Sequence, residues 1–167
     1  MKGRIFFSNK MIIVLLTALF LFSLSLTTTT VKSSINDNTT SEPSFLALTP
    51  HDPIYITSDS GLEVFPGLGT EIDPYVIEGY KITTWTDYGI YIRDTNKYFT
   101  VRNCYVDAGE YGIYIYNVAD GTTTIINNTC NNNNIHGIKL EFSGSSTVAN
   151  NTCNNNGYGI ALAFSGS

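Results

Sequence analysis

The sequence has few side chains that bind soft metal ions or nucleic acids. It contains two methionines, two histidines and three cysteines. Met1 and Met11 lie near the start, and His51 and His136 are far apart, so only the cysteines offer neighbouring soft ligands and we do not expect a copper site. Nine basic residues stand against fourteen acidic ones, and this net charge of −5 argues against a nucleic-acid partner.

Patterns of the length that a helix needs are also missing. Val, Ile, Thr and Tyr dominate the apolar stretches, and runs of Asn and Gly interrupt them at intervals too short for three helical turns. The sequence therefore predicts short strands separated by turns.

Residues 1–34 have the layout of a secretory signal peptide. Lys2, Arg4 and Lys10 precede an apolar run over 11–26, and Thr and Ser follow it. The run is shorter than the ~20 residues that comfortably span a bilayer, and an uncleaved membrane anchor is the alternative interpretation. We predict an exported protein, located outside the cell or on its surface, that touches the membrane only if this segment stays attached.

We expect the mature chain to begin between about Thr27 and Ile35, because the apolar run ends at Leu26 and small polar residues follow. Mass spectrometry of the secreted protein measures that first residue directly. Intact Met1 in the membrane fraction would show instead that the segment is an anchor.

The chain after the signal peptide divides into a polar linker and one folded domain. Residues 35–52 are mostly Asn, Asp, Thr, Ser, Pro and Glu without periodicity, which is typical of a flexible segment. Residues 53–167 are expected to form the domain, beginning with a strand over 54–56 and a weaker strand phrase over 61–64. The Gly- and Pro-rich stretch 65–74 predicts a loop of turns.

One pattern of about two dozen residues is repeated four times along this domain. A glycine-led apolar phrase recurs at Gly89, Gly112, Gly137 and Gly159, spaced 23, 25 and 22 residues apart. A second column agrees with that register, because Ile77, Val101, Ile125 and Val148 are spaced 24, 24 and 23 apart. A fixed period of this size predicts stacked structural repeats.

Each repeat has room for about three strands wound once around an axis, so that every strand pairs in parallel with its equivalents above and below. This predicts an all-β fold, a parallel β-helix with about 23–24 residues in each coil. Alternation along the strands then places one set of side chains inside: Ile90, Ile92, Ile113, Ile115, Ile138, Leu140, Ile160 and Leu162. The positions between them, Tyr91, Tyr114, Lys139 and Ala161, point outward.

A column of asparagines accompanies the apolar columns. Asn103, Asn127 and Asn150 would stack as a structural ladder whose amides bond along the axis. Asn127 and Asn150 head N-x-T sequons that this ladder would partly occlude, which leaves Asn38 as the glycosylation candidate.

Cys130 and Cys153 occupy the column that holds Ile82 and Val106 in the earlier coils. We expect two small buried thiols there, and a disulfide between them is the alternative that the strand spacing permits. Cys104 makes the number of cysteines odd.

The stacked Gly-Ile-x-Ile/Leu phrase, the Asn-Asn turns and the opening stretch 69–77 resemble the right-handed parallel β-helix repeat family of the pectate-lyase-like superfamily. In pattern the chain is most similar to exported archaeal and bacterial surface proteins and to periplasmic, copper-associated NosD-type proteins. The resemblance covers about residues 53–167 and implies the fold rather than an activity, because this fold carries lyases, hydrolases, adhesins and scaffolds alike.

Carboxylates are the first candidates for chemistry. Asp87 and Glu110 each lie two residues before the glycine of their coil, so they would stack on adjacent coils within the ~5–5.5 Å separation of retaining glycosidases. The same two side chains are the candidates for a calcium ion. Arg93 and Arg102 are the local candidates for the basic residue of a lyase. The alternative is that Asp87 and Glu110 are solvated turn residues without a catalytic role. The equivalent positions in the next two coils are Ile135 and Gly157, so the acidic column does not continue.

Outward aromatic residues are the candidates for ligand binding. Rings stacked along a flat sheet offer faces to sugar rings, or they only stabilise adjacent coils. The candidates are Tyr88, Tyr91, Tyr111, Tyr114, His136 and Tyr158. We predict a structural or adhesive surface protein that contacts a cell-surface or extracellular polysaccharide, and the alternative is a carbohydrate-active enzyme, either a polysaccharide lyase or a glycoside hydrolase.

The last coil carries no recognisable cap. The phrase Phe-Ser-Gly-Ser at 142–145 leads into the coil of Cys153, and the same phrase at 164–167 leads into nothing further. Because an uncapped coil shows unpaired backbone groups and an open apolar core, we expect either further coils in the natural protein or self-association through this edge.

Overall fold

The structure is a computed structural model that describes residues 47–165. The predicted signal peptide, most of the predicted linker and Asn38 lie outside the described residues. Within residues 47–165 there is no helix long and apolar enough to cross a membrane.

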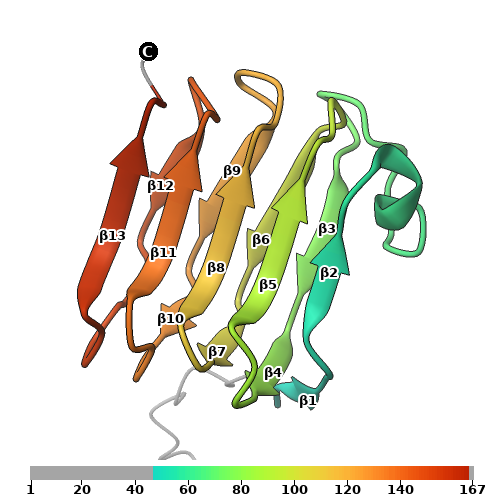
Figure 1. Cartoon of the computed structure of the whole chain (residues 1–167). Helices are drawn as coiled ribbons and strands as arrows, with labels where there is room; N and C mark the ends of the chain where they lie inside the picture. The colour runs from blue at the N-terminus through green and yellow to red at the C-terminus, as the bar shows by residue number, and fades with distance from the viewer. Residues whose placement is uncertain (1–46, 166–167) are drawn as a thin grey trace, which may run out of the picture. The chain divides into compact units, whose positions relative to one another are not determined.

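The described chain is a parallel β-helix with three sheets, as the repeat predicts (Figure 1). The first sheet has the order β1-β4-β7-β10, the second β13-β11-β8-β5-β2 and the third β12-β9-β6-β3. The strands are β1 Thr49–Pro50, β2 Ile54–Ile56, β3 Tyr75–Glu78, β4 Tyr80–Thr83, β5 Tyr88–Arg93, β6 Phe99–Arg102, β7 Tyr105–Asp107, β8 Tyr111–Tyr116, β9 Thr123–Ile126, β10 Thr129–Cys130, β11 His136–Glu141, β12 Thr147–Ala149 and β13 Tyr158–Ala163.

Strand pairing follows the sequence columns. Ile90 pairs with Ile113, Ile113 with Ile138, and Ile138 with Ile160, all in parallel. The third sheet stacks Ile77, Val101, Ile125 and Val148 in the same way. The predicted right-handed β-helix fold is confirmed.

The core is the inside of the coils. The inward isoleucines of β5 and β8 and their equivalents on β11 are completely buried, whereas the tyrosines between them are half-buried. This alternation is the period of two that a strand imposes, with its apolar side chains on the inner face.

The glycines that open the first three phrases, Gly89, Gly112 and Gly137, are required by the close approach of the next coil. A Cβ atom at Gly112 would lie 2.5 Å from the carbonyl oxygen of Gly137 and 3.1 Å from the Cβ of Cys130. The glycine column therefore makes room for the thiol column on the neighbouring coil.

The first coil differs from its prediction at two points. Residues 61–64 were expected to form a strand, but Asp59–Leu62 is a short 3-10 helix, η1, because consecutive turn-forming residues end β2 and Leu62 folds into the core. The folded part also begins before Pro53, since β1 pairs with β4 and the Thr49 amide donates to the Gly79 carbonyl at 2.8 Å.

The predicted asparagine ladder is displaced by one residue. Asn103, Asn127 and Asn150 stand in the left-handed backbone region with φ of 52°, 56° and 55°, and Asn127 and Asn150 are exposed rather than occluded. The bonded ladder is formed by the following asparagines, where the Asn128 amide nitrogen donates to Asn151 Oδ1 at 3.0 Å. The tight turn explains the shift, because the left-handed residue turns the chain and the next side chain points inward.

A second ladder joins Asn133 to Asn156, with an amide–carbonyl distance of 2.7 Å. The sequence reasoning did not predict it, although these two asparagines hold equivalent places in the repeat.

The last described coil leaves its inner face open. Ile160 is 46% and Leu162 61% exposed, whereas Ile138 and Leu140, their partners on β11, are completely buried.

Candidate functional site

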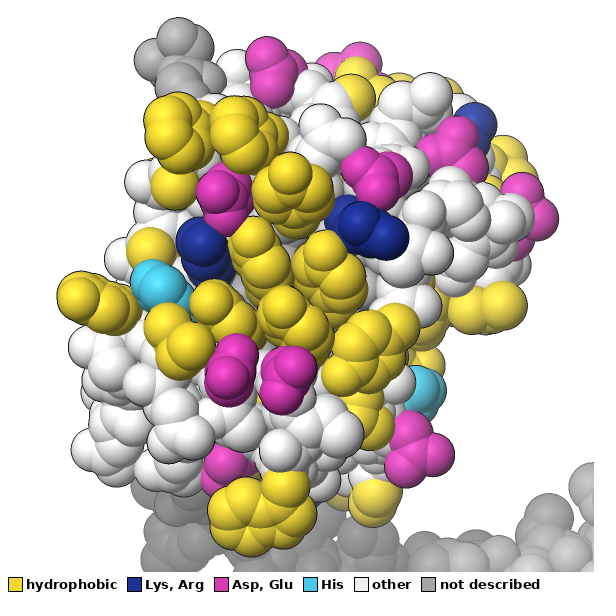
Figure 2. Space-filling view, viewed as in Figure 1, with side chains coloured by type: hydrophobic (Ala, Val, Ile, Leu, Met, Phe, Trp, Pro, Cys, Tyr) yellow, Lys and Arg dark blue, Asp and Glu magenta, His cyan; other side chains and the backbone are white. Residues whose placement is uncertain are grey.

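A band of aromatic side chains covers the outer face of the sheet β13-β11-β8-β5-β2 (Figure 2). Two columns build it, because outward residues of paired strands lie side by side. One column contains Tyr88, Tyr111, His136 and Tyr158, and the other contains Tyr55, Tyr91 and Tyr114. We call these seven residues the aromatic band. The structure thus brings all six predicted ligand-binding candidates onto one face.

Most rings of the band stack on each other. The Tyr88 and Tyr111 ring centroids are 5.3 Å apart at an interplanar angle of 18°, and those of Tyr91 and Tyr114 are 5.4 Å apart at 29°. His136 lies between Tyr111 and Tyr158, with centroid distances of 5.5 and 5.1 Å. Such pairs stabilise neighbouring coils, and they cover ring faces that a sugar would otherwise use.

Tyr55 and the nearby Trp85 do not follow this stacking. Tyr55 meets Tyr88 edge-on at an interplanar angle of 89° and is 51% exposed. Its hydroxyl lies 3.5 Å from the Thr86 hydroxyl, next to Trp85, which is 99% exposed in the turn before β5. These two rings therefore have faces open to a ligand.

Sequence reasoning missed both of these rings. Residues 54–56 and 90–92 have the same sequence, Ile-Tyr-Ile. This identity could have placed Tyr55 in the column of Tyr91, with which it pairs. Trp85 lies in a turn outside the repeated columns, so no periodic signal pointed to it.

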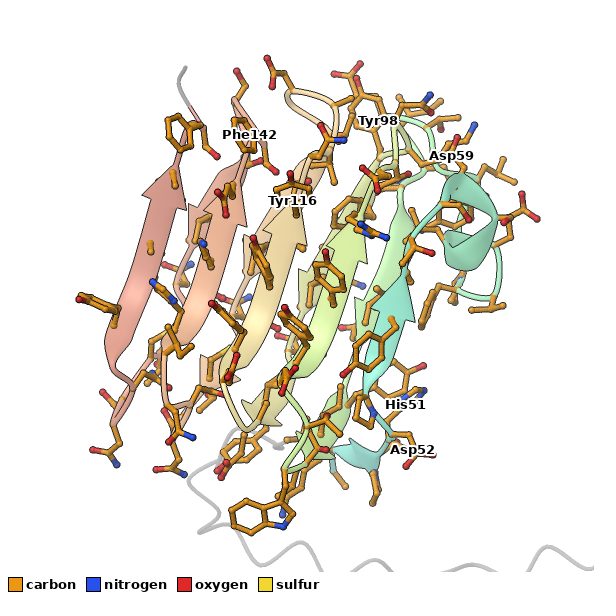
Figure 3. The ribbon with its side chains drawn as sticks, viewed as in Figure 1. His51, Asp52, Asp59, Tyr98, Tyr116 and Phe142 are labelled. Atoms are coloured by element: carbon orange, nitrogen blue, oxygen red, sulfur yellow. The ribbon has the colours of Figure 1, made fainter. Side chains whose placement is uncertain are left out.

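Aromatic residues continue beyond the band at the carboxyl ends of β8 and β11 (Figure 3). Tyr116 and Phe142 meet edge-on with ring centroids 5.8 Å apart, and Phe142 stacks on Phe164 at 5.0 Å.

A polar network crosses the band. The Tyr114 hydroxyl donates to Glu141 Oε2 at 2.7 Å, and the Lys139 ammonium lies 2.8 Å from the same carboxylate and 5.0 Å from the Tyr114 ring centroid. The hydrogen bond from Lys139, followed by that from Tyr114, lowers the pKa of Glu141. Burial and the bond to Glu141 raise the pKa of Tyr114, so at neutral pH the tyrosine stays neutral and the Glu141 carboxylate stays ionised.

His136 is the one imidazole of the aromatic band. Burial, followed by the nearby positive charge of Lys139, lowers the pKa of its imidazole, and the ring is therefore neutral at pH 7. Its Nδ1 atom is buried without a hydrogen-bond partner among the described residues.

The carboxylate candidates lie on neighbouring coils, as predicted, but no base joins them. The Glu110 amide donates to the Asp87 carbonyl at 3.1 Å, which places the two residues side by side at the amino ends of β8 and β5. Arg93 lies at the opposite end of β5, about 20 Å along the chain from Asp87, and pairs with Asp94 at 3.5 Å. Arg102 belongs to another sheet and pairs with Glu78 at 2.7 Å.

The thiol column differs from the aromatic band because it faces the core. Cys130 is completely buried and Cys153 partly buried, and both are free thiols, as is Cys104. The described residues contain no group of three or more His, Cys, Asp or Glu side chains that could hold a metal ion.

A family model described as "Periplasmic copper-binding protein (NosD)" matches residues 70–167. No curated protein and no solved structure matches the chain. Copper sites in proteins combine thiolate, thioether and imidazole ligands. In the described part of the chain, Cys130 and Cys153 supply two adjacent thiols, and no third His, Cys, Asp or Glu side chain joins them in a group. We assign no step to copper.

The match covers more than half of the chain and begins in the loop before β3. It therefore includes the coils whose columns define the fold, from β3 to β13. This agreement between the repeat, the stacked parallel sheets and the family model shows that the chain belongs to the NosD family.

Proposed function

We propose that this protein is an exported, non-catalytic β-helix scaffold of the cell envelope that binds polysaccharide through its aromatic face. The family is described as periplasmic, which supports an envelope location. The observation that carries the proposal is the aromatic band, with the open faces of Tyr55 and Trp85 at its edge.

Sugar rings bind proteins by placing their apolar faces on aromatic rings while hydroxyl groups bond to nearby polar atoms. Tyr55 and Trp85 supply the open faces, and the threonine hydroxyls of the same turn, Thr84 and Thr86, supply donors and acceptors 3.0 Å from each other. The rings in the interior of the band stack on each other across neighbouring coils. The proposed contact is therefore at the β2–β5 edge rather than over Tyr91 and Tyr114.

The charges near the band favour a neutral polysaccharide over an acidic one. Lys139 is neutralised by Glu141 and Arg93 by Asp94. Within the described residues, no ion pair neutralises Asp87 or Glu110 at the amino ends of the same strands. A uronate-rich chain lying on this face would be repelled by both carboxylates.

The separation of Arg93 from Asp87 and Glu110 argues against a polysaccharide lyase, because its base and acid must reach the same sugar unit of the substrate. The alternative, a polysaccharide lyase or glycoside hydrolase, is tested by a uronate-release assay and a reducing-end assay on the same glycans. Product formation that disappears in Glu110→Gln would replace the proposed scaffold by an enzyme.

Tyr55→Ala and Trp85→Ala are each expected to weaken glycan binding by about two- to tenfold, because each removes one stacking face worth about 0.5–1.5 kcal/mol. A glycan array on the secreted protein identifies the ligand, and calorimetry on the best neutral oligosaccharide measures the change. Circular dichroism should be unchanged, since both side chains are largely exposed.

Two variants serve as controls for this experiment. Ile72→Ala removes an apolar side chain that is as exposed as Trp85 from a loop outside the band, and it should leave binding intact. Tyr91→Ala combined with Tyr114→Ala should lower stability, because it removes stacked rings and the bond to Glu141. Loss of binding in the Ile72 variant, or none in the Tyr55 and Trp85 variants, would contradict the proposed contact.

A further inference from the structure

We propose that Cys130 and Cys153 are a disulfide-forming site that links two adjacent coils when the chain meets a disulfide oxidant. The site faces the core and is independent of the aromatic band. It is therefore a modification site separate from the proposed glycan contact.

The backbone places the two cysteines in register. Thr129 and Thr152 form a parallel bridge, and the amide of Cys130 donates to the carbonyl of Thr152 at 2.8 Å. Parallel neighbours of this kind have Cα atoms about 4.8 Å apart, inside the range of about 4.4–6.8 Å that disulfides span. Both side chains point into the core, where Cys130 is 0% exposed and Cys153 packs against the buried cluster.

The glycine column holds the two side chains in place. A Cβ atom at Gly112 would lie 3.1 Å from the Cβ of Cys130, and one at Gly137 would lie 2.9 Å from the Cβ of Cys153. Each cysteine thus packs closely on the backbone of a glycine.

The two thiols have unequal roles. The interaction between the two neighbouring thiols lowers the pKa of Cys153 and raises that of Cys130. Cys153 is also the more exposed of the two, so it is the nucleophile that a dissolved oxidant meets first.

The reaction is a thiol–disulfide exchange with a small or protein disulfide. The Cys153 thiolate attacks one sulfur of the oxidant, forms a mixed disulfide and releases the other half as a thiolate. Cys130 then gives its proton to a released thiolate and attacks the Cys153 sulfur, which expels the second half. The two cysteines lose two electrons and the oxidant is reduced to two thiols.

Cys104 is the third thiol of the chain and takes no part in the proposed disulfide. Its Sγ donates to the Arg102 carbonyl oxygen at 3.3 Å, and burial raises its pKa to about 11. It lies on the other side of the turn from the column of Cys130 and Cys153, in a position equivalent to Asn128 and Asn151. We expect it to stay reduced.

The test is oxidation of the secreted protein with oxidised glutathione, followed by alkylation, denaturation and trypsin digestion. Lys139 lies between the two cysteines, so Cys104 and Cys130 fall in the peptide 103–139 and Cys153 in the peptide 140–167. We expect these two peptides to be linked in the wild type and in Cys104→Ser. They should be separate in Cys130→Ser, with a glutathione adduct on 140–167.

Stability supplies a second readout. The oxidised Cys104→Ser variant should have a higher unfolding midpoint than its reduced form, and a reductant should reverse the shift. If Cys130→Ser does not fold, Cys153→Ala should give only alkylated thiols on 103–139 after oxidation. Alkylated Cys153 in the oxidised wild type, or a link that survives in Cys130→Ser, would overturn the proposal.

Discussion

Replacing Asn128 by Ala is expected to lower the free energy of unfolding by about 3 kcal/mol or more, because buried polar groups left unpaired cost about 1–3 kcal/mol each. The Asn128 side chain accepts from the Cys104 amide at 3.0 Å and donates to the Val101 carbonyl at 2.9 Å and to Asn151 at 3.0 Å. The side chain is almost completely buried, so water cannot replace these bonds without entering the core.

Urea denaturation followed by circular dichroism measures this loss. The matched control is Asn127→Gly, which changes the neighbouring asparagine and keeps its left-handed backbone, at φ 56°, accessible. Asn127 is exposed, and its replacement should change stability by less than about 1 kcal/mol. Equal losses in the two variants would show that the turn, rather than the buried ladder, supplies the stability.

Replacing Ile115 by Ala is expected to cost about 2–5 kcal/mol, the usual range for deleting a large aliphatic side chain from a packed core. Ile115 is completely buried on β8, and its column neighbours are Ile92 on β5 and Leu140 on β11. The cavity would therefore open in the middle of the stack, where coils on both sides lose packing.

The control for this variant is Ile126→Ala on β9, where the same side chain is half-buried and the next residue of the column is Ala149. That change should cost clearly less. Denaturation monitored by both circular dichroism and tyrosine fluorescence compares the variants. Because coils of a solenoid contact only their neighbours, the Ile115 variant should also broaden the transition. A cost at Ile115 no larger than that at Ile126 would place the stabilising core elsewhere.

The family and fold alone do not decide the activity, because β-helices position different chemistry on the same coils. The decisive facts for this chain are local. Arg93 lies at the far end of β5 from Asp87, and the rings of the band cover each other's faces. These facts led us to propose a binding face at Tyr55 and Trp85 instead of a catalytic groove.

The sequence by itself determined the coils and their register. Strand pairing between identical repeats leaves a single alignment in which every apolar column faces inward, and a slip of one residue would expose Ile113 and Ile138. For the same reason the stacking of Tyr88, Tyr111, His136 and Tyr158, and the adjacency of Asp87 and Glu110, followed from spacing alone.

Only the tertiary structure decided which of two consecutive asparagines faces the core. Asn127 and Asn128 are chemically identical, and the choice depends on the left-handed turn that precedes the inward residue. It likewise decided that 59–62 forms a 3-10 helix and that Tyr55 and Trp85 keep open ring faces. The period of the repeat determines which residues share a column. Turn geometry and ring orientation depend on contacts with neighbouring coils, and residue spacing does not reveal those contacts.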